Sequence, residues 1–129
     1  MFANKTSAEQ VRVWVAGCAT GEEAYSIAIL LREHAARLAD PPKIQIFATD
    51  IDMGALAVAR RGCYDASTMA SLDPALVASH FVKTGNRHEV SRCLRDMVVI
   101  ARQDLVADPP FLRLDLVSCR NVLIYLQNE

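Results

Sequence analysis

The spacing of hydrophobic residues changes near residue 20, and this change predicts a strand followed by a helix. Val11, Val13 and Val15 alternate with other residues, which is the two-residue period of a β-strand. From residue 22 the apolar side chains fall three and four residues apart, along one face of a helix that we expect to reach about residue 38. The turn between them, residues 17–21, reads GCATG. This is the first crossover of a doubly wound α/β sheet, a fold that binds ligands at the carboxyl ends of its strands.

Further apolar runs predict the other strands of this sheet. Residues 43–49 alternate, whereas residues 97–101 and 114–118 are almost continuously apolar, as in strands buried on both faces of a parallel sheet. Residues 81–96 are less regular, and we expect short antiparallel strands there around a turn at residues 85–86. The fold class predicted is therefore α/β, with a mostly parallel, incomplete sheet, flanking helices and a small inserted antiparallel β-subdomain.

Capping residues mark two further helices. Asp52 has the character of an N-cap for a helix over 53–61, and Gly62 that of the glycine that closes it. Asp73 and Pro74 form an N-cap and N1 pair that opens a short helix.

Composition narrows the class of protein. A chain of 129 residues with 52% hydrophobic and 22% charged residues is a single globular domain, for which we expect residues 1–10 to be a disordered lead and 11–129 the domain. The net charge of −1 gives no nucleic-acid footprint, and no apolar run suggests membrane insertion. The four cysteines lie far apart without a C-x-x-C pair, and residues 1–10 contain no export signal. These features predict a cytoplasmic protein without a metal site.

The sequence of the turn at residues 17–21 limits which class of ligand can bind there. A dinucleotide-binding turn reads G-x-G-x-x-G, whereas here G-x-x-x-G is followed by Glu22 and Glu23. Two carboxylates would repel a pyrophosphate but suit a ligand rich in hydroxyl and ammonium groups, such as S-adenosylmethionine. On pattern alone, a turn without any small-molecule role is an equal alternative.

An acidic residue at the end of the second strand is where these folds bind ribose hydroxyls. Asp50 is our candidate for ribose binding, while Asp52 is better explained as a helix cap. His80 and His88 have no third ligand at metal spacing, so we interpret both as structural or surface residues. The cysteines nearest the strand ends, Cys18 and Cys119, are read as packing residues rather than nucleophiles.

Four segments together resemble the chemotaxis receptor methyltransferases, the CheR family. They are VWVAGCATGEEAYSIA at 13–28, FATDID at 47–52, A-R-x-G-x-Y at 59–64 and CRNVLIYL at 119–126. The resemblance spans the chain from Val11 onward. It implies a Rossmann-like class I methyltransferase domain that uses S-adenosylmethionine to form glutamate methyl esters on the cytoplasmic helices of chemoreceptors, leaving S-adenosylhomocysteine. It also equates about 81–96 with a β-subdomain that docks a receptor's C-terminal peptide in some members.

The resemblance implies roles for the matching residues. Those expected to bind the cofactor are Gly17, Gly21, Glu22, Asp50, Asp104, Leu105, Arg120 and Asn121. Glu22 would lie near the methionine end, and Asp104 with Leu105 at the adenine. Tyr125 would face the methyl-transfer centre as the catalytic residue, although without the resemblance it reads as a buried aromatic. No general base is expected, because a glutamate carboxylate is already anionic at neutral pH.

The sequence departs from the family in three respects. Asp104 stands where the family usually has asparagine, so an amide donor is lost. Residues 1–129 include neither the family's N-terminal helical domain nor the final strands of its sheet. We therefore expect a fragment that is weak or inactive alone and that could dimerise through its open sheet edge. Two alternatives remain: a dinucleotide oxidoreductase, and a non-catalytic module that binds cofactor or receptor.

Overall fold

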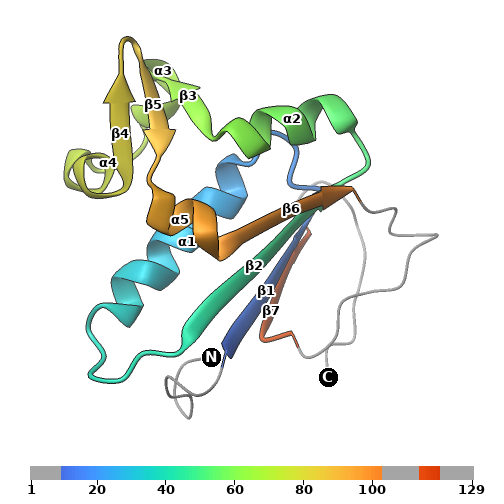
Figure 1. Cartoon of the computed structure of the whole chain (residues 1–129), viewed down its shortest axis with the longest axis vertical. Helices are drawn as coiled ribbons and strands as arrows, with labels where there is room; N and C mark the ends of the chain where they lie inside the picture. Colours follow the sequence, from blue (N-terminus) through green and yellow to red (C-terminus); the bar gives the residue numbers. More distant parts are fainter. Residues whose placement is uncertain (1–9, 103–113, 120–129) are drawn as a thin grey trace.

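The computed structural model describes residues 10–102 and 114–119, and a four-stranded parallel sheet runs through this part of the chain (Figure 1). Its strands are β1 (Gln10–Ala16), β2 (Lys43–Asp50), β6 (Val98–Arg102) and β7 (Leu116–Cys119). They lie in the order β6-β2-β1-β7, and each neighbouring pair is parallel. The chain leaves β1 for β2 on one side, while β7 pairs with β1 on the other, so the strand order reverses at β1. Such a reversal opens a crevice for ligands beyond the carboxyl ends of the strands.

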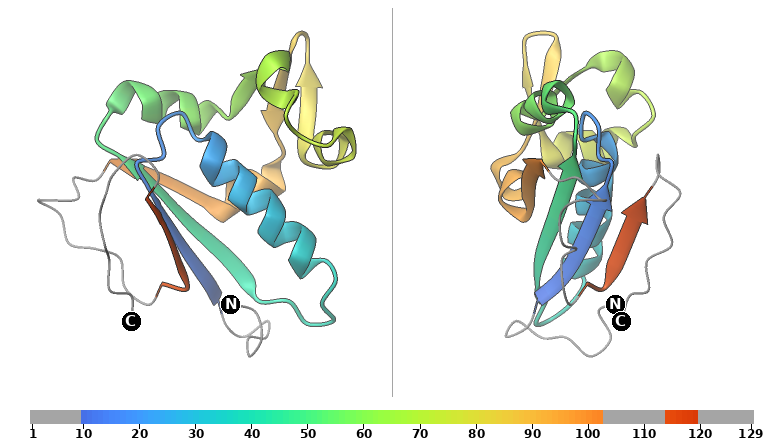
Figure 2. Two further views of the ribbon diagram at one scale, coloured as in Figure 1. Left: turned by 180° about the vertical axis from the view of Figure 1, so that it is seen from behind. Right: turned by 90° about the vertical axis from the view of Figure 1, so that its right-hand side faces the viewer.

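One helix connects β1 to β2, and a second one follows β2. They are α1 (Glu22–Ala35) and α2 (Met53–Arg61), and α1 runs along one face of the sheet (Figure 2). The alternating valines of β1 are buried in the same core cluster as Ala24, Ala28 and Leu31 of α1. Burial of these two apolar faces against each other is the main force that holds the crossover together.

A second, smaller sheet stands apart from the first (Figures 1 and 2). It is antiparallel, with the strand order β3-β5-β4. Its strands and the helices beside them are β3 (Cys63–Asp65), α3 (Ala66–Met69), α4 (Pro74–His80), β4 (Phe81–Thr84), β5 (Arg87–Val90) and α5 (Arg92–Met97). The fold class is as predicted: a Rossmann-like arrangement with a mostly parallel, incomplete sheet and a small antiparallel one.

The predicted caps are confirmed. The side chain of Asp52 accepts a hydrogen bond from the Ala55 amide at 3.1 Å, and Gly62 ends α2 with a φ of 59°. The side chain of Asp73 accepts from the Ala75 amide at 2.8 Å, ahead of Pro74 in the first turn of α4.

Two local predictions were wrong, and one short strand was not predicted. First, α1 ends at Ala35 rather than near residue 38, because the amides of Arg37 and Leu38 bond three residues back and tighten the chain into a turn. Second, residues 92–97 form a helix, since Ser91 caps them by accepting from the Leu94 amide, and the parallel strand begins only at residue 98. Third, β3 was missed, because three residues are too few to show a strand period. The predicted lead at 1–10 lies outside the described residues except for Gln10.

Candidate functional site

The turn after β1 folds back over the carboxyl end of β2. The Cys18 amide donates to the Thr49 carbonyl at 2.9 Å, and the Gly21 amide donates to the Cys18 carbonyl at the same distance. The φ angles of Gly17, Ala19 and Gly21 are 69°, 51° and 96°. A left-handed backbone conformation costs an alanine conformational free energy, so the surrounding contacts must hold Ala19 in place.

Asp50 supplies one of those contacts. Its Oδ2 accepts from the Ala19 amide at 2.8 Å, and its Oδ1 accepts from the Asp52 amide at 3.0 Å. A carboxylate oxygen has two lone pairs, so each oxygen can still accept a further hydrogen bond. The half-buried Asp50 therefore fixes the turn and keeps the capacity to bind two hydroxyl groups.

Gly21 lies where a side chain does not fit. A Cβ atom there would come within 2.9 Å of the Ala59 Cβ and 3.0 Å of the Tyr64 hydroxyl. The left-handed φ of 96° adds backbone strain for any other residue. The turn is thus packed directly against α2 and β3.

Glu22 begins α1 with its side chain exposed, and it accepts a hydrogen bond from the Thr20 hydroxyl. Its negative charge is stabilised by the helix dipole. Burial raises the pKa of the neighbouring Cys18 to about 11, and the charges of Asp50 and Glu22 act in the same direction. Cys18 is therefore a neutral thiol near pH 7, in agreement with its interpretation as a packing residue.

Tyr64 is a contributor that the sequence analysis did not single out, although it ends the A-R-x-G-x-Y segment. Its hydroxyl donates to the Thr20 carbonyl at 2.8 Å. Tyr25 meets it edge-on with 6.2 Å between ring centroids, and the Tyr25 hydroxyl donates to the Ala59 carbonyl at 2.8 Å. Burial raises the pKa of both tyrosines, so both hydroxyls keep their protons and act as donors.

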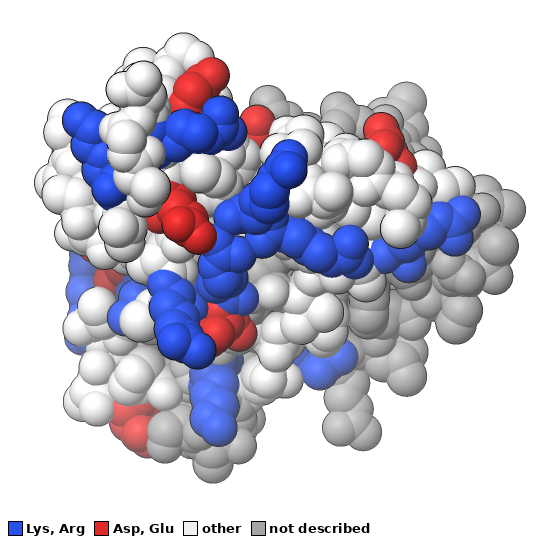
Figure 3. Space-filling model, turned by 45° about the horizontal axis from the view of Figure 1, so that its top comes forward, with Lys and Arg blue, Asp and Glu red and all other residues white. Residues whose placement is uncertain are grey.

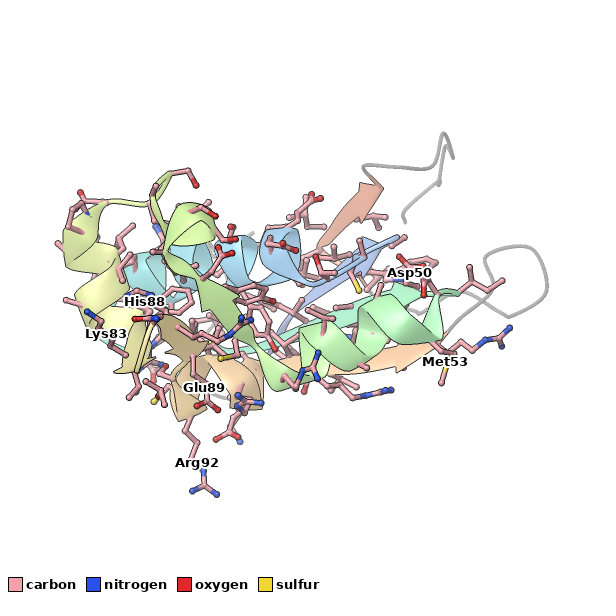
Figure 4. All side chains as sticks on the ribbon, turned by 90° about the horizontal axis from the view of Figure 1, so that it is seen from above. Asp50, Met53, Lys83, His88, Glu89 and Arg92 are labelled. Atoms are coloured by element: carbon pink, nitrogen blue, oxygen red, sulfur yellow. The ribbon has the colours of Figure 1, made fainter. Side chains whose placement is uncertain are left out.

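Four predicted cofactor residues thus meet at one end of the main sheet: Gly17, Gly21, Glu22 and Asp50. Figure 4 shows Asp50 and Met53 at this end, remote from Lys83 and His88 of the small sheet. The other predicted site residues, Asp104, Leu105, Arg120, Asn121 and Tyr125, lie outside the described residues, and their roles stay predictions.

A cavity of about 510 Å³ lies elsewhere in the described part of the chain. It is lined by Lys43 at the amino end of β2 and by His80 and Glu33, whose Nε2 and Oε2 atoms are 2.7 Å apart. His80 is buried in this pair, as expected of a structural histidine. A cavity at the amino ends of the strands is not where a doubly wound sheet binds its cofactor.

The described residues contain neither a metal-binding cluster nor a helix that could cross a membrane. Between residues 10 and 102 and in 114–119, no group of three or more His, Cys, Asp or Glu side chains could hold a metal ion. Within the same ranges no helix has the length and apolar character needed to cross a membrane.

The strand order and the site together define a Rossmann-like cofactor-binding domain with acidic groups where the ligand's hydroxyl and ammonium groups would lie. Comparison with protein families is specific: residues 1–129 match the CheR methyltransferase, SAM binding domain. The chain belongs to this family, and its cofactor is S-adenosylmethionine. The resemblance seen in the sequence is thereby confirmed, and a dinucleotide is not favoured.

Individual relatives agree with this assignment. A chemotaxis protein methyltransferase 2 of Pseudomonas aeruginosa is 40% identical over 121 residues, 89% of this chain and 42% of its own. A chemotaxis protein methyltransferase of Salmonella typhimurium is 37% identical over 125 residues, 90% of this chain and 42% of its own. A 104.1 kDa protein of the hypE 3′ region of Rhodobacter capsulatus is 38% identical over all 129 residues, but these make up 14% of its length. The chain thus spans less than half of each relative.

The described residues fit the cofactor. The Asp50 carboxylate keeps acceptor capacity that would suit ribose hydroxyls, and the exposed Glu22 carboxylate would suit an amino group. The absence of a side chain at Gly21 lets the turn pack directly against Ala59 of α2 and Tyr64 of β3, which fixes the backbone next to Glu22.

Proposed function

We propose that the protein containing this chain transfers the methyl group of S-adenosylmethionine to glutamate side chains of chemoreceptors, forming methyl esters. The observation that supports this best is the meeting of Glu22 and Asp50 at the Gly17–Gly21 turn in a chain that matches the CheR family throughout. The names of the relatives from Pseudomonas aeruginosa and Salmonella typhimurium place those proteins in chemotaxis.

The reaction requires the protein mainly to align the cofactor with the acceptor carboxylate. The cofactor supplies a sulfonium-bound methyl group, and the acceptor carboxylate is anionic without a general base. The site must therefore hold the two reactants in line and exclude water. Asp50 would fix the ribose and Glu22 the amino group, so that the cofactor cannot slide along the turn.

The roles of the site residues that lie outside the described part of the chain stay proposals. Asp104 and Leu105 would bind the adenine, and Arg120 with Asn121 would line the pocket. Tyr125 would orient the acceptor carboxylate by hydrogen bonding. We also propose that the protein acts on a chemoreceptor, that it is cytoplasmic and that it self-associates through the open edge of the sheet.

A second candidate is a non-catalytic module that binds the cofactor or a receptor. The described site residues are compatible with it, because Asp50 and Glu22 would hold a ligand without taking part in methyl transfer.

Titration calorimetry with S-adenosylhomocysteine tests the cofactor site. Asp50→Asn removes one carboxylate charge but keeps an oxygen of the same shape, and we expect it to weaken binding by about tenfold, ~1.4 kcal/mol. Asp52→Asn makes the same chemical change two residues away, at a helix cap, and should leave the affinity unchanged. Equal effects of the two substitutions would contradict ribose binding at Asp50.

Radiolabelled methyl transfer to a chemoreceptor cytoplasmic fragment then separates the two candidates. Base-labile label on the receptor would identify a methyl ester. Cofactor binding without label, also in the full-length protein, would favour the non-catalytic module.

A further inference from the structure

Five arginines form one face across α2, α5 and the end of β6, and we call this the arginine face. They are Arg60, Arg61, Arg92, Arg95 and Arg102. All are exposed except Arg95, which is half-buried. Figure 3 shows the Lys and Arg side chains of this region as a band across the molecule, with few acidic side chains along it.

Arg95 and Arg60 together tie the three elements to one another. The Arg95 guanidinium donates to the carbonyls of Arg60 and Arg61 at the end of α2, both at 2.7 Å, and to Glu89 at 2.9 Å. Arg60 in turn donates to the Ile100 carbonyl of β6 at 3.3 Å. Contacts with backbone carbonyls therefore set the positions of the Arg60 and Arg95 guanidinium groups.

Little of this charge is neutralised. The acceptors of Arg60 are neutral carbonyls, and within the described residues the face has one ion pair, that of Arg95 with Glu89. Arg61, Arg92 and Arg102 form no ion pair in that part of the chain. Guanidinium groups held close together without counter-charges create a positive potential that attracts anions.

The face also reaches the cofactor end of the sheet. Arg102 is the last residue of β6 and is paired in register with Asp50 of β2. A partner bound along the arginines from α5 to Arg102 would therefore extend to the carboxyl ends of the strands, where the predicted cofactor residues meet.

We propose that the arginine face docks an acidic helical surface of the protein substrate. This inference rests on the proposed function: a substrate methylated on glutamates presents carboxylates around the acceptor, and charge complementarity steers such a surface to the face. A nucleic acid is the less favoured ligand, because the chain as a whole has a net charge of −1.

Charge reversal on the face provides the test. The double substitution Arg61→Glu and Arg92→Glu alters two exposed arginines for which no side-chain hydrogen bond is found within the described residues. The matched control is Arg32→Glu with Arg37→Glu, two exposed arginines at and just after the end of α1 that give the same net charge. The probe is a fluorescent helical peptide with two glutamates per turn, together with its glutamine counterpart, followed by anisotropy.

We expect the face variant to bind the glutamate peptide at least about tenfold more weakly than wild type, and the control to stay within about twofold. Raising the salt from about 50 to 300 mM should weaken wild-type binding strongly, because exposed charges are screened. Equal losses in both variants, equal binding of the glutamine peptide, or no wild-type binding at low salt would overturn the proposal. Tighter binding of duplex DNA with the same dependence on Arg61 and Arg92 would overturn it in favour of nucleic acid.

S-adenosylhomocysteine affinity, measured on the same samples, keeps the two proposals apart. The face variant should bind it like wild type, because Arg61 and Arg92 are not among the proposed cofactor residues. If wild type does not bind S-adenosylhomocysteine, this result counts against the proposed function. If the face variant binds the peptide as well as wild type does, this result counts only against the docking face.

Discussion

The carboxylate of Asp50 accepts a hydrogen bond from the backbone N–H of Ala19, with 2.8 Å between Oδ2 and N. The two residues are 31 positions apart and belong to different crossovers of the sheet. Asp50 therefore organises the turn in addition to its proposed role in ligand binding, and the two roles can be measured separately.

Asp50→Ala should lower the free energy of unfolding by about 1–2 kcal/mol, because it leaves the Ala19 and Asp52 amides without their acceptor. The estimate is at the low end for a charged acceptor, since the site is only half-buried. Urea denaturation followed by circular dichroism measures the change. Asp50→Asn, which can still accept one of these bonds, should cost less, and an equal cost would contradict this role.

Gly21→Ala should destabilise the fold by about 2–4 kcal/mol, because the new Cβ would meet Ala59 at 2.9 Å at a left-handed φ. Gly85→Ala is the control. Its φ of 60° is also left-handed, but no atom lies within 4 Å of the added Cβ, so about 1 kcal/mol of backbone strain is expected. Similar unfolding midpoints for the two variants would show that the packing at Gly21 is unimportant.

Tyr64→Phe should weaken S-adenosylhomocysteine binding by about fivefold, ~1 kcal/mol, because the Thr20 carbonyl loses the donor that holds the turn. Tyr25→Phe removes an equally buried hydroxyl that bonds to Ala59 of α2 instead. It should cost similar stability and leave the affinity unchanged. Calorimetry and thermal unfolding on both variants give the comparison, and parallel losses of affinity would argue against a role for Tyr64 in positioning the turn.

Stability should fall as the pH rises from about 9 to about 11. Burial raises the pKa of Cys18 from 9.0 to about 11, so the folded state retains a proton that the unfolded state releases in this window. The stabilisation is complete below pH 9 and is lost as the pH rises to the folded pKa, up to about 3 kcal/mol. Because the pKa values of Tyr25 and Tyr64 are also raised, the quantity to measure is the difference between wild type and Cys18→Ala. A pH-independent difference would contradict the prediction.

Much of the secondary structure could be predicted from the sequence, because its causes are local. The alternation of Val11, Val13 and Val15 reflects one buried face of a strand, and Asp52 caps a helix that begins one residue later. Gly62 likewise ends α2 through its own left-handed conformation. Each of these depends on a few neighbouring residues, and the fold class followed from their order along the chain.

Tertiary structure alone decided which distant residues meet. The bond from Tyr64 to Thr20 joins residues 44 positions apart, and β3 exists as a strand because Cys63–Asp65 pair with residues 87–89 of β5. The arginine face likewise arises only when α2 packs against α5 through Arg95 and against β6 through Arg60. Hydrophobic period and capping report on residues within one or two turns of each other, whereas these contacts depend on how the sheet places separate segments side by side.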